Sequence, residues 1–490
     1  MGTVISESQT AFVRDRQILD GILIVIEVVD EARRAKKEFM LFKVDFEKAY
    51  DSVDWGYLDV VMGRMGFPTL WRKWIKECVC TATASILVNG SSTDEFPLER
   101  GLRQGDPLSP FLFLLAAEGL HVMMEAMEAQ NLFSGYMVGK SAPISVSHLQ
   151  FADDTLLMGT KNWANVRALR VVLVLFETMS GLKVNFNKSM LVGVKISDSW
   201  LGEAASALGC RVGKIPFLYR GLPIGGDPRR LRFWETVLTH LKKRLSGWKS
   251  HFLSFGGRLV LLKSVLTSLQ LREFNLALLG KWCWRLLVDR EGLWFRVLTA
   301  RYGVERGRLC ARGRKGSAWW REAARNRDGG GEVEGGWFGG HISRQVGDGS
   351  DTFFWTDPWV DGTPLCERFG RLFDLAANKS VFVVEMFQSG WGVGGEAWVH
   401  SSDRWLWQPD LDRGYTVRGA YQLLTDQAVH VRISVVSCQL MGWFGSGDSS
   451  DSLGSLCSVH DFSRWYSSAS FFYATHMADL RVGCVDRAKS

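Results

Sequence analysis

Two adjacent acids, Asp153 and Asp154, stand in the stretch LQFADDTLLMG, between two runs of apolar and β-favouring residues. Carboxylates held side by side are hard oxygen ligands of the kind that Mg²⁺ accepts, and a third carboxylate could complete a site for two metal ions. A structural explanation is also open, because Asp suits tight turns and two short runs separated by two residues predict a β-hairpin. The elements that position the acids decide between the two interpretations.

A third acid, Asp45, ends the apolar stretch FMLFKVDF, which predicts a strand. A helix is expected after it, with Ser52 as the N-cap and Gly66 at its end. Asp45 is therefore expected at the carboxyl end of a strand, and an antiparallel sheet could bring it to the hairpin tip that carries Asp153 and Asp154. Clustered acids repel one another and raise each other's pKa, so a metal ion is the natural resolution.

The rest of the N-terminal half alternates hairpins with helices. The Asn-Gly pair at residues 89–90 predicts a hairpin turn. Helices are expected over residues 111–130 and 163–180, and KVNFNKSMLVGV predicts a strand pair with a turn near Asn187. Helices that alternate with hairpins, not with parallel strands, predict an α+β fold built on an antiparallel sheet.

The totals of the chain exclude several classes of protein. Its 490 residues exceed one ordinary core, and 46% hydrophobic with 23% charged residues describe a folded globular protein. The nine cysteines are an odd number without the dense spacing of a secreted scaffold, so a reducing compartment is expected. Charges begin at Glu7 and the apolar runs are short, so we expect no signal peptide or transmembrane segment and an intracellular location, nucleus or cytoplasm.

Basic residues concentrate in residues 229–263, although the whole chain has a formal net charge of only +7. This basic segment holds nine Lys or Arg against one acid, Glu235, interleaved with Leu, Val, Phe and Trp. Such a pattern suits a nucleic-acid backbone or an acidic membrane surface, and a solvated helical face is the plain alternative. The cations are Arg229, Arg230, Arg232, Lys242, Lys243, Arg244, Lys249, Arg258 and Lys263.

Five motifs occur in one order along the chain: DFEKAYD, GLRQGDPLSP, LQFADDTLLM, GLKVNFNKS and YRGLPIGG. In this order they resemble the palm motifs of reverse transcriptases of plant non-LTR (LINE-type) retrotransposons. Several motifs in one order are far more specific than a single motif. The resemblance covers about residues 4–270. It implies a right-hand polymerase palm with partial fingers and a helical thumb, whose partners are an RNA template, a DNA primer and deoxynucleoside triphosphates, with no membrane.

The resemblance implies a metal site. Asp45, Asp153 and Asp154 would be the ligands of two Mg²⁺ ions, with Mn²⁺ as a substitute, in a two-metal nucleotidyl transfer. Phe46 would offer its backbone carbonyl to a metal. The expected activity is that of an RNA-directed DNA polymerase.

The resemblance also implies a nucleotide site. Tyr50 would pack beneath the incoming sugar and exclude a 2′-hydroxyl, with an ordinary core tyrosine as the alternative. Gln104 and Gly105 would lie near the nascent base pair, where an amide can hydrogen-bond and a missing Cβ lets backbone approach the nucleotide. Lys188 would donate a proton to the pyrophosphate, unless it is a solvated surface lysine.

Composition and resemblance together predict four parts of the chain. We expect partial fingers and palm in residues 1–195, primer grip and basic thumb in 196–270, a Trp/Gly-rich C-terminal region in 271–427, and a low-complexity, disordered tail in 428–490. The last motif departs from the family, which usually has Leu where Arg220 stands here.

Two hypotheses remain open. The chain is a reverse transcriptase domain, truncated because only 44 residues precede Asp45 and the finger strands are incomplete, or it is a catalytically inactive retroelement remnant that at most binds nucleic acid. A basic membrane-surface protein would leave the three acids without a role. A zinc site is not expected, because the Cys and His residues of the tail do not match a familiar ligand spacing.

Overall fold

The computed structural model forms two compact units. It describes residues 2, 4–227, 230, 233, 235, 239, 254, 271–305, 307–311, 316–328, 337–390 and 402–426. The first unit comprises Met1–Gly226 with Gly292–Arg301, and the second comprises the described residues within Asp227–Glu291 and Tyr302–Met477. Of the nine cations of the basic segment, Arg230 is described, and the other eight lie outside the described residues, as does the expected tail.

A five-stranded sheet organises the first unit, with the strand order β11-β10-β1-β9-β8. Its strands are β1 (Phe39–Val44), β8 (His148–Phe151), β9 (Asp154–Gly159), β10 (Met190–Val194) and β11 (Arg211–Gly213). β1 is the central strand and pairs antiparallel with β9 and β10, whereas β10 and β11 pair parallel. β1 is buried at every position except the half-buried Lys43, as expected of a strand covered on both faces.

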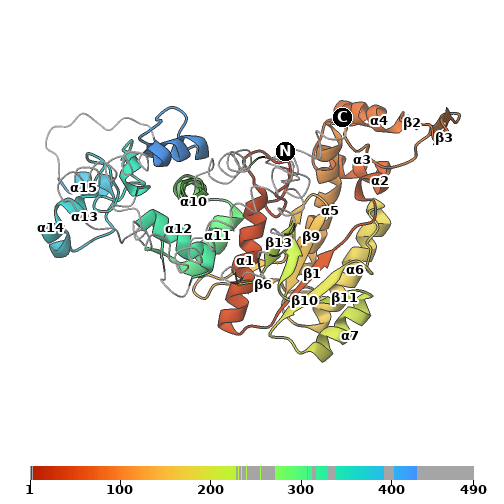
Figure 1. Ribbon diagram of the computed structural model, residues 1–490, viewed down its shortest axis with the longest axis horizontal. Helices are drawn as coiled ribbons and strands as arrows, with labels where there is room; N and C mark the ends of the chain where they lie inside the picture. The colour runs from red at the N-terminus through yellow and green to blue at the C-terminus, as the bar shows by residue number, and fades with distance from the viewer. Residues whose placement is uncertain are drawn as a thin grey trace. The chain divides into compact units, whose positions relative to one another are not determined.

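Helices lie on both sides of this sheet. The helices of the first unit are α1 (Ile18–Ala35), α2 (Ala49–Ser52), α3 (Trp55–Arg64), α4 (Thr69–Cys80), α5 (Ser109–Ala129), α6 (Trp163–Ser180), α7 (Asp198–Leu208) and α11 (Leu293–Tyr302). Figure 1 shows α1 on one side of the strands and α6 and α7 on the other. Because side chains alternate along a strand, Met40, Phe42 and Val44 point to one face, where they share a core with Phe113 and Phe176 of the helices.

Short hairpins complete the first unit. Their strands are β2 (Thr83–Ala84), β3 (Leu87–Val88), β4 (Ser91–Ser92), β5 (Phe96–Pro97), β6 (Tyr136–Val138), β7 (Ile144–Val146), β12 (Phe217–Tyr219) and β13 (Leu222–Ile224). The expected turn at Asn89 and Gly90 joins β3 to β4, and both residues have positive φ, as a two-residue hairpin turn requires. The α+β architecture on a mainly antiparallel sheet is confirmed.

Two local expectations are wrong. The helix after β1 is capped by Asp54, whose Oδ1 accepts the Tyr57 N–H at 2.7 Å, and Ser52 instead ends the short helix α2. Residues 183–194 do not form a strand pair, because only β10 is a strand there. The backbone N–H of Asn185 is used elsewhere, since it donates to the carbonyl of Asp45 at 2.7 Å.

The helix α5 is the one helix in the described part of the chain that is long and apolar enough to cross a membrane. Half of its most apolar window is buried inside the fold, where Phe113, Leu114 and Leu120 belong to the core of the first unit. A core helix passes the same test of length and composition, so α5 is weak support for a membrane span.

The Trp-rich region forms the core of the second unit. Its elements are α10 (Leu271–Val288), β14 (Val304–Glu305), β15 (Arg308–Leu309), α12 (Ala318–Asp328), the short helix η4 (Gly339–His341), β16 (Ile342–Gln345), α13 (Leu365–Arg368), α14 (Gly370–Leu375), α15 (Val383–Gln388) and β17 (Arg404–Trp407). β16 pairs antiparallel with β17. Trp337, Phe338, Trp405 and Trp407 pack together with Ala277 of α10, so the tryptophans are core residues.

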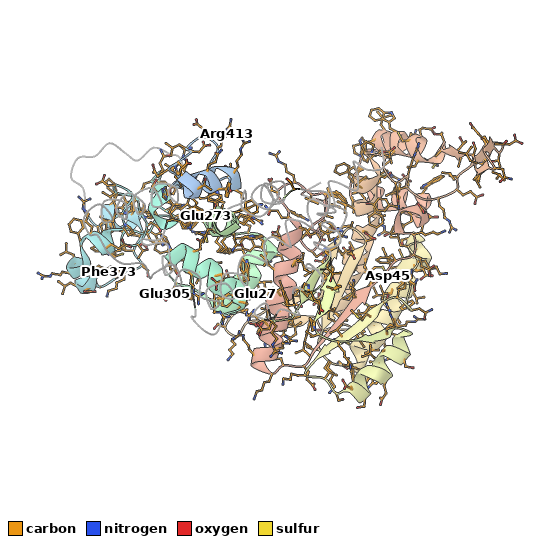
Figure 2. The ribbon with its side chains drawn as sticks, viewed as in Figure 1. Glu27, Asp45, Glu273, Glu305, Phe373 and Arg413 are labelled. Carbon is orange, nitrogen blue, oxygen red and sulfur yellow. The ribbon has the colours of Figure 1, made fainter. Side chains whose placement is uncertain are left out.

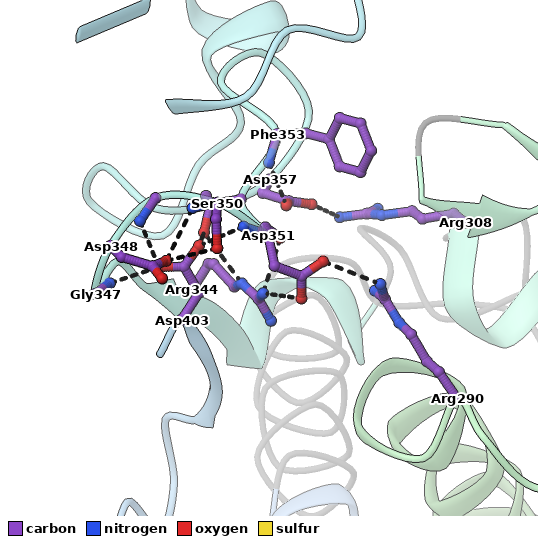
Figure 3. A network of polar contacts seen from close by, with 12 residues as sticks. Arg290, Arg308, Arg344, Gly347, Asp348, Ser350, Asp351, Phe353, Asp357 and Asp403 are labelled. Atoms are coloured by element: carbon purple, nitrogen blue, oxygen red, sulfur yellow. Dashed lines mark hydrogen bonds and ion pairs between the residues drawn. The ribbon is translucent and has the colours of Figure 1, made fainter. Parts of the chain in front are cut away.

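A polar network fixes the loop after β16 (Figure 3). The carboxylate of Asp403 accepts the backbone N–H groups of Gly347 at 2.6 Å, Gly349 at 3.0 Å and Asp351 at 2.9 Å. The guanidinium of Arg344, which is almost fully buried, donates to Asp351 at 2.6 Å. The buried guanidinium of Arg344 and the half-buried carboxylate of Asp403 therefore satisfy the polar groups of this loop.

Candidate active site

The antiparallel register of β1 and β9 brings the sequence-predicted acids to one edge of the sheet. Val44 pairs with Thr155, so Asp45, which follows Val44, and Asp154, which precedes Thr155, stand at neighbouring positions on adjacent strands. Figure 2 labels Asp45 at this end of β1. Two motifs that are far apart in sequence thus meet in space.

The third acid, Asp153, lies in the turn that joins β8 to β9. Phe151 pairs with Asp154, which leaves Ala152 and Asp153 as the two turn residues, with Ala152 at φ 53°. The turn therefore begins one residue earlier than expected, and Asp154 is the first residue of β9. The turn explanation is confirmed for Asp153. The site explanation stays a prediction, for which the charge interaction between Asp153 and Asp154 is the supporting observation.

A loop before β10 holds the backbone of Asp45 in place. The N–H of Asp45 donates to the hydroxyl of Ser189 at 3.0 Å, and its carbonyl accepts the N–H of Asn185 at 2.7 Å. Lys188 precedes Ser189, and its own N–H donates to the carbonyl of Asn185 at 3.1 Å. The exposed Lys188 thus lies on the loop that is hydrogen-bonded to Asp45.

Like charges accumulate at this edge. Desolvation of the Asp153 carboxylate raises its pKa, and the negative charges of Asp154 and, less strongly, Asp45 raise it further. Asp153 is nevertheless an exposed residue at the turn. The desolvation of its carboxylate is therefore partial. A divalent cation would relieve this repulsion, and three carboxylates are the hard oxygen donors that such an ion prefers. The donor set therefore fits a divalent metal.

The carboxylates of Asp45, Asp153 and Asp154 are suitable donors for a metal ion, but in this structure their side chains are not arranged around a common point. Among the described residues, no group of three or more His, Cys, Asp and Glu side chains could hold a metal ion. Instead, Nη1 of Arg220 lies 2.6 Å from Oδ2 of Asp154. Sequence reasoning noted that Arg220 departs from the family but did not predict this ion pair, for which a cation at a hairpin turn is the only local signal.

The two aromatic candidates pack at the border of the core. The ring of Tyr50 in α2 stacks on Phe113 with a centroid distance of 4.6 Å and an interplanar angle of 18°. Phe46, the residue after Asp45, makes an edge contact with Phe176 at 6.2 Å. Both rings are half-buried, so each has a packing role whether or not it also contacts a nucleotide.

Gln104 and Gly105 lie in the exposed loop between β5 and α5. Gly105 has φ 93°, and a Cβ added to it would meet no atom within 4 Å. The loop is tied to α2, because Leu102 donates its N–H to the carbonyl of Tyr50 at 2.7 Å. This hydrogen bond links the loop that carries Gln104 and Gly105 to the segment that follows Asp45.

Comparison with known proteins finds similarity mainly in the first unit. Residues 1–211 match the family model described as "Reverse transcriptase (RNA-dependent DNA polymerase)". The retrovirus-related Pol polyprotein of a type-1 retrotransposable element of Popillia japonica is 27% identical over 191 residues, which are 39% of this chain and 26% of that protein. An uncharacterized 149 kDa protein of a Xenopus laevis transposon is 26% identical over 274 residues, 55% of this chain and 20% of that protein.

An uncharacterized mitochondrial protein of Arabidopsis thaliana is 40% identical over 77 residues, which are 16% of this chain and 62% of that protein. The chain thus spans less than two thirds of the length of each of these relatives. The match covers the whole five-stranded sheet except the end of β11, and it includes Asp45, Asp153 and Asp154.

Proposed function

We propose that this chain, whose residues 1–211 match the reverse transcriptase family model, acts as the RNA-directed DNA polymerase of a non-LTR retrotransposon of the plant LINE type. One observation carries the proposal: the register of β1 and β9 gathers Asp45, Asp153 and Asp154 at one edge of the sheet. The Arabidopsis relative supports the plant type. The substrates would be an RNA template, a DNA primer and deoxynucleoside triphosphates.

The three acids would hold two divalent ions, Mg²⁺ or Mn²⁺. When bound, such ions lower the pKa of an attacking hydroxyl and neutralise the charge of a leaving pyrophosphate. The contacts of the Asp45 backbone with Asn185 and Ser189 would fix the first carboxylate. Phe46 would turn its backbone carbonyl toward the same site, and the exposed ammonium of Lys188 would donate a proton to a pyrophosphate oxygen.

Three further residues would form the nucleotide site. The stacking of Tyr50 on Phe113 would hold the tyrosine ring beneath the incoming sugar, where it leaves no room for a 2′-hydroxyl. The amide of Gln104 would hydrogen-bond near the nascent base pair. Gly105, which has open space where a side chain would stand, would let the nucleotide approach the backbone.

The template and primer would extend beyond the sheet. Residues 1–195 would serve as partial fingers and palm, 196–270 as primer grip and thumb, and 271–427 as an additional Trp/Gly-rich region. The nine cations of the basic segment would contact phosphates, which positions a nucleic acid without reading its sequence. Arg230, the described member, has a strongly exposed side chain.

Primer extension on an RNA template with Mg²⁺ tests the function. We compare the native chain with the double variant Asp153→Ala, Asp154→Ala. A matched control, Asp94→Ala with Glu95→Ala, removes two adjacent acids that are exposed elsewhere in the first unit. We expect extension by the native chain and the control, and none by the Asp153 and Asp154 variant. Extension by all three proteins would contradict the assignment of the acids.

A second candidate function is that of an inactive retroelement remnant that binds nucleic acid. The contact of Arg220 with Asp154 favours it, because one of the three carboxylates is already bound by a cation. For this candidate we expect RNA binding that weakens steeply with salt, as phosphate contacts do, without nucleotide incorporation by a folded native chain.

A further inference from the structure

Arg220 occupies an unusual position in the last of the five motifs. It lies in the two-residue turn of the β12–β13 hairpin, where Tyr219 pairs with Leu222. Arg220 and Gly221 have φ values of 50° and 83°, the left-handed pair that such a turn requires. This conformation disfavours Arg and Leu alike, so the turn does not explain the presence of a cation here.

The guanidinium of Arg220 is held on the acidic edge by several contacts. Its Nη1 lies 2.6 Å from Oδ2 of Asp154, and the side chains of both partners are only about a quarter exposed, at 26% and 25%. The guanidinium carbon lies 4.6 Å from the centroid of the Phe151 ring, within the range of a cation–π contact. The hydroxyl of Tyr219 donates to the carbonyl of Asp154 at 3.4 Å. The hairpin is thus fastened to the strand that carries the acid.

We propose that Arg220 is an internal cation that competes with a divalent metal ion for the carboxylate of Asp154, so that metal binds there only when the Arg220 side chain moves away. This inference rests on the proposed function, since it concerns the same three acids. Arg220 would lower the affinity of the site for metal, whereas the three carboxylates would raise it.

The competition follows from charge and from the number of acceptor atoms. A guanidinium beside Asp154 repels a second cation and leaves fewer of its oxygen lone pairs free. It also cancels one of the three negative charges that would attract a metal to Asp45, Asp153 and Asp154. Leu, the usual residue at this position in the family that the chain resembles, would neither repel a metal ion nor cancel a negative charge.

A Mn²⁺ titration of the full chain, with free Mn²⁺ followed by electron paramagnetic resonance, tests the competition without reference to activity. We compare the native chain with Arg220→Leu and Arg220→Gln, which remove the charge and differ in polarity. The double variant Asp153→Asn, Asp154→Asn measures Mn²⁺ bound elsewhere on the chain, and that amount is subtracted. Far-ultraviolet circular dichroism confirms that each variant is folded.

Lys161→Met is the matched control. Lys161 lies 2.8 Å from Glu38, and its side chain has the same 26% exposure as that of Arg220. Glu38 directly precedes β1, whereas Asp45 directly follows it. The control therefore removes one equally exposed positive charge from an ion pair at the opposite end of the central strand, where the acid is more exposed, at 51%.

We expect both Arg220 variants to bind Mn²⁺ on the order of tenfold more tightly than the native chain, the size of effect that a neighbour of a metal ligand has. The control is expected to match the native chain. Equal affinities of the native chain and the Arg220 variants would overturn the competition, while primer extension by the native chain would leave the proposed function standing. Absence of Mn²⁺ bound by the acids in every variant, together with absence of extension, would overturn both.

Discussion

Asp154, the first residue of β9, stands beside Asp45 because Val44 pairs with Thr155 on the neighbouring strand. The backbone register alone fixes this relationship, so the folded chain must bring acidic groups together whether or not a cation is present. Asp153 in the adjoining turn adds a third carboxylate, with a raised pKa. A fold that concentrates like charges in this way gives up some stability at the site.

Removal of one of these charges is therefore expected to stabilise the metal-free chain. Because the folded state raises the pKa of Asp153, this group favours folding when protonated, and its contribution is lost as the pH rises through the folded pKa. At pH 7 we expect Asp153→Asn to raise the free energy of unfolding, by less than about 1 kcal/mol because the residue is exposed. Urea unfolding in the presence of a chelator measures the difference.

The exposed residue Asp412 provides a comparison in the other unit. Asp412→Asn removes the same charge without a site of like charges, and its effect on the free energy of unfolding is expected to be smaller. The stabilisation by Asp153→Asn should also diminish as the pH falls, because the native Asp153 carboxyl then becomes protonated. A destabilised Asp153→Asn variant at pH 7 would contradict the inferred repulsion.

A buried ion pair fastens α11 to α1, although the two helices are far apart in sequence. Arg301 contacts Glu27 and Asp30, and the side chains of Arg301 and Glu27 are 6% and 0% exposed. Figure 2 labels Glu27 on α1. Arg301→Met removes the cation from a fully buried carboxylate, so we expect it to lower the free energy of unfolding by about 3 to 5 kcal/mol.

The same helix offers the control. Arg296 pairs with Glu7, but these side chains are 48% and 47% exposed. Solvent screens such a pair, so Arg296→Met is expected to change the free energy of unfolding by less than about 1 kcal/mol. Chemical denaturation of the two variants in parallel measures the contrast, and similar losses for both would show that burial does not decide the strength of the Arg301 pair.

Local signals in the sequence were sufficient for the elements that carry the site. The apolar stretch before Asp45 predicted β1, the Asn-Gly pair predicted the β3–β4 hairpin, and the acid pair predicted the β8–β9 turn to within one residue. In each of these stretches a short-range preference and the tertiary fold agree. Prediction succeeds where the two do not compete.

The errors occurred where tertiary contacts override local preference. The residues before β10 have a strand-like pattern, but Asn185 and its neighbours bond to the segment after β1 and not to a hairpin partner. The pairs Arg220–Asp154 and Arg301–Glu27 join residues far apart in sequence. Such pairs leave no periodic signal, so sequence alone could suggest the presence of a cation but not its partner.

The network around Asp403 is expected to be essential for the second unit. Desolvation raises the pKa of Asp403, but the hydrogen bonds from Thr352, Gly347, Gly349 and Asp351 outweigh it, and the net pKa is lowered. Asp403→Ala should therefore destabilise this unit by about 2 to 3 kcal/mol, since several donors lose a charged acceptor. Tryptophan fluorescence during urea unfolding follows both units but is weighted toward this one, because its core is rich in Trp.

Asp412→Ala is the matched variant, because Asp412 is exposed in the same unit; its effect on unfolding is expected to stay within about 0.5 kcal/mol. The lowered pKa adds a pH signature. The contribution of Asp403 is present above its usual pKa of 3.8 and is lost as the pH falls through the lowered value. If Asp403→Ala and Asp412→Ala unfold alike at neutral pH, the network does not stabilise the loop.

A buried histidine in β8 is expected to make the first unit sensitive to acid. Nε2 of His148 lies 3.0 Å from the hydroxyl of Ser8 and 2.8 Å from Nδ1 of His121, and Nδ1 of His148 lies 3.0 Å from the hydroxyl of Ser147. Burial and, next, the charge of His121 lower the pKa of His148 from 6.5 to about 3. The folded chain therefore keeps this imidazole neutral at pH values where an unfolded chain would protonate it.

The sign of the effect follows from proton linkage. Below pH 6.5 the unfolded state binds a proton that the folded state does not. The free energy of unfolding therefore decreases as the pH is lowered, by up to about 1.4 kcal/mol per pH unit. The buried Glu118 acts in the opposite direction, because burial raises its pKa and the folded state takes up its proton first. Urea unfolding between pH 7 and pH 4 should show a flatter profile for His148→Asn than for the native chain, and a steeper one for Glu118→Gln. Equal slopes for the native chain and His148→Asn would show that His148 is protonated in the folded state as readily as in the unfolded state.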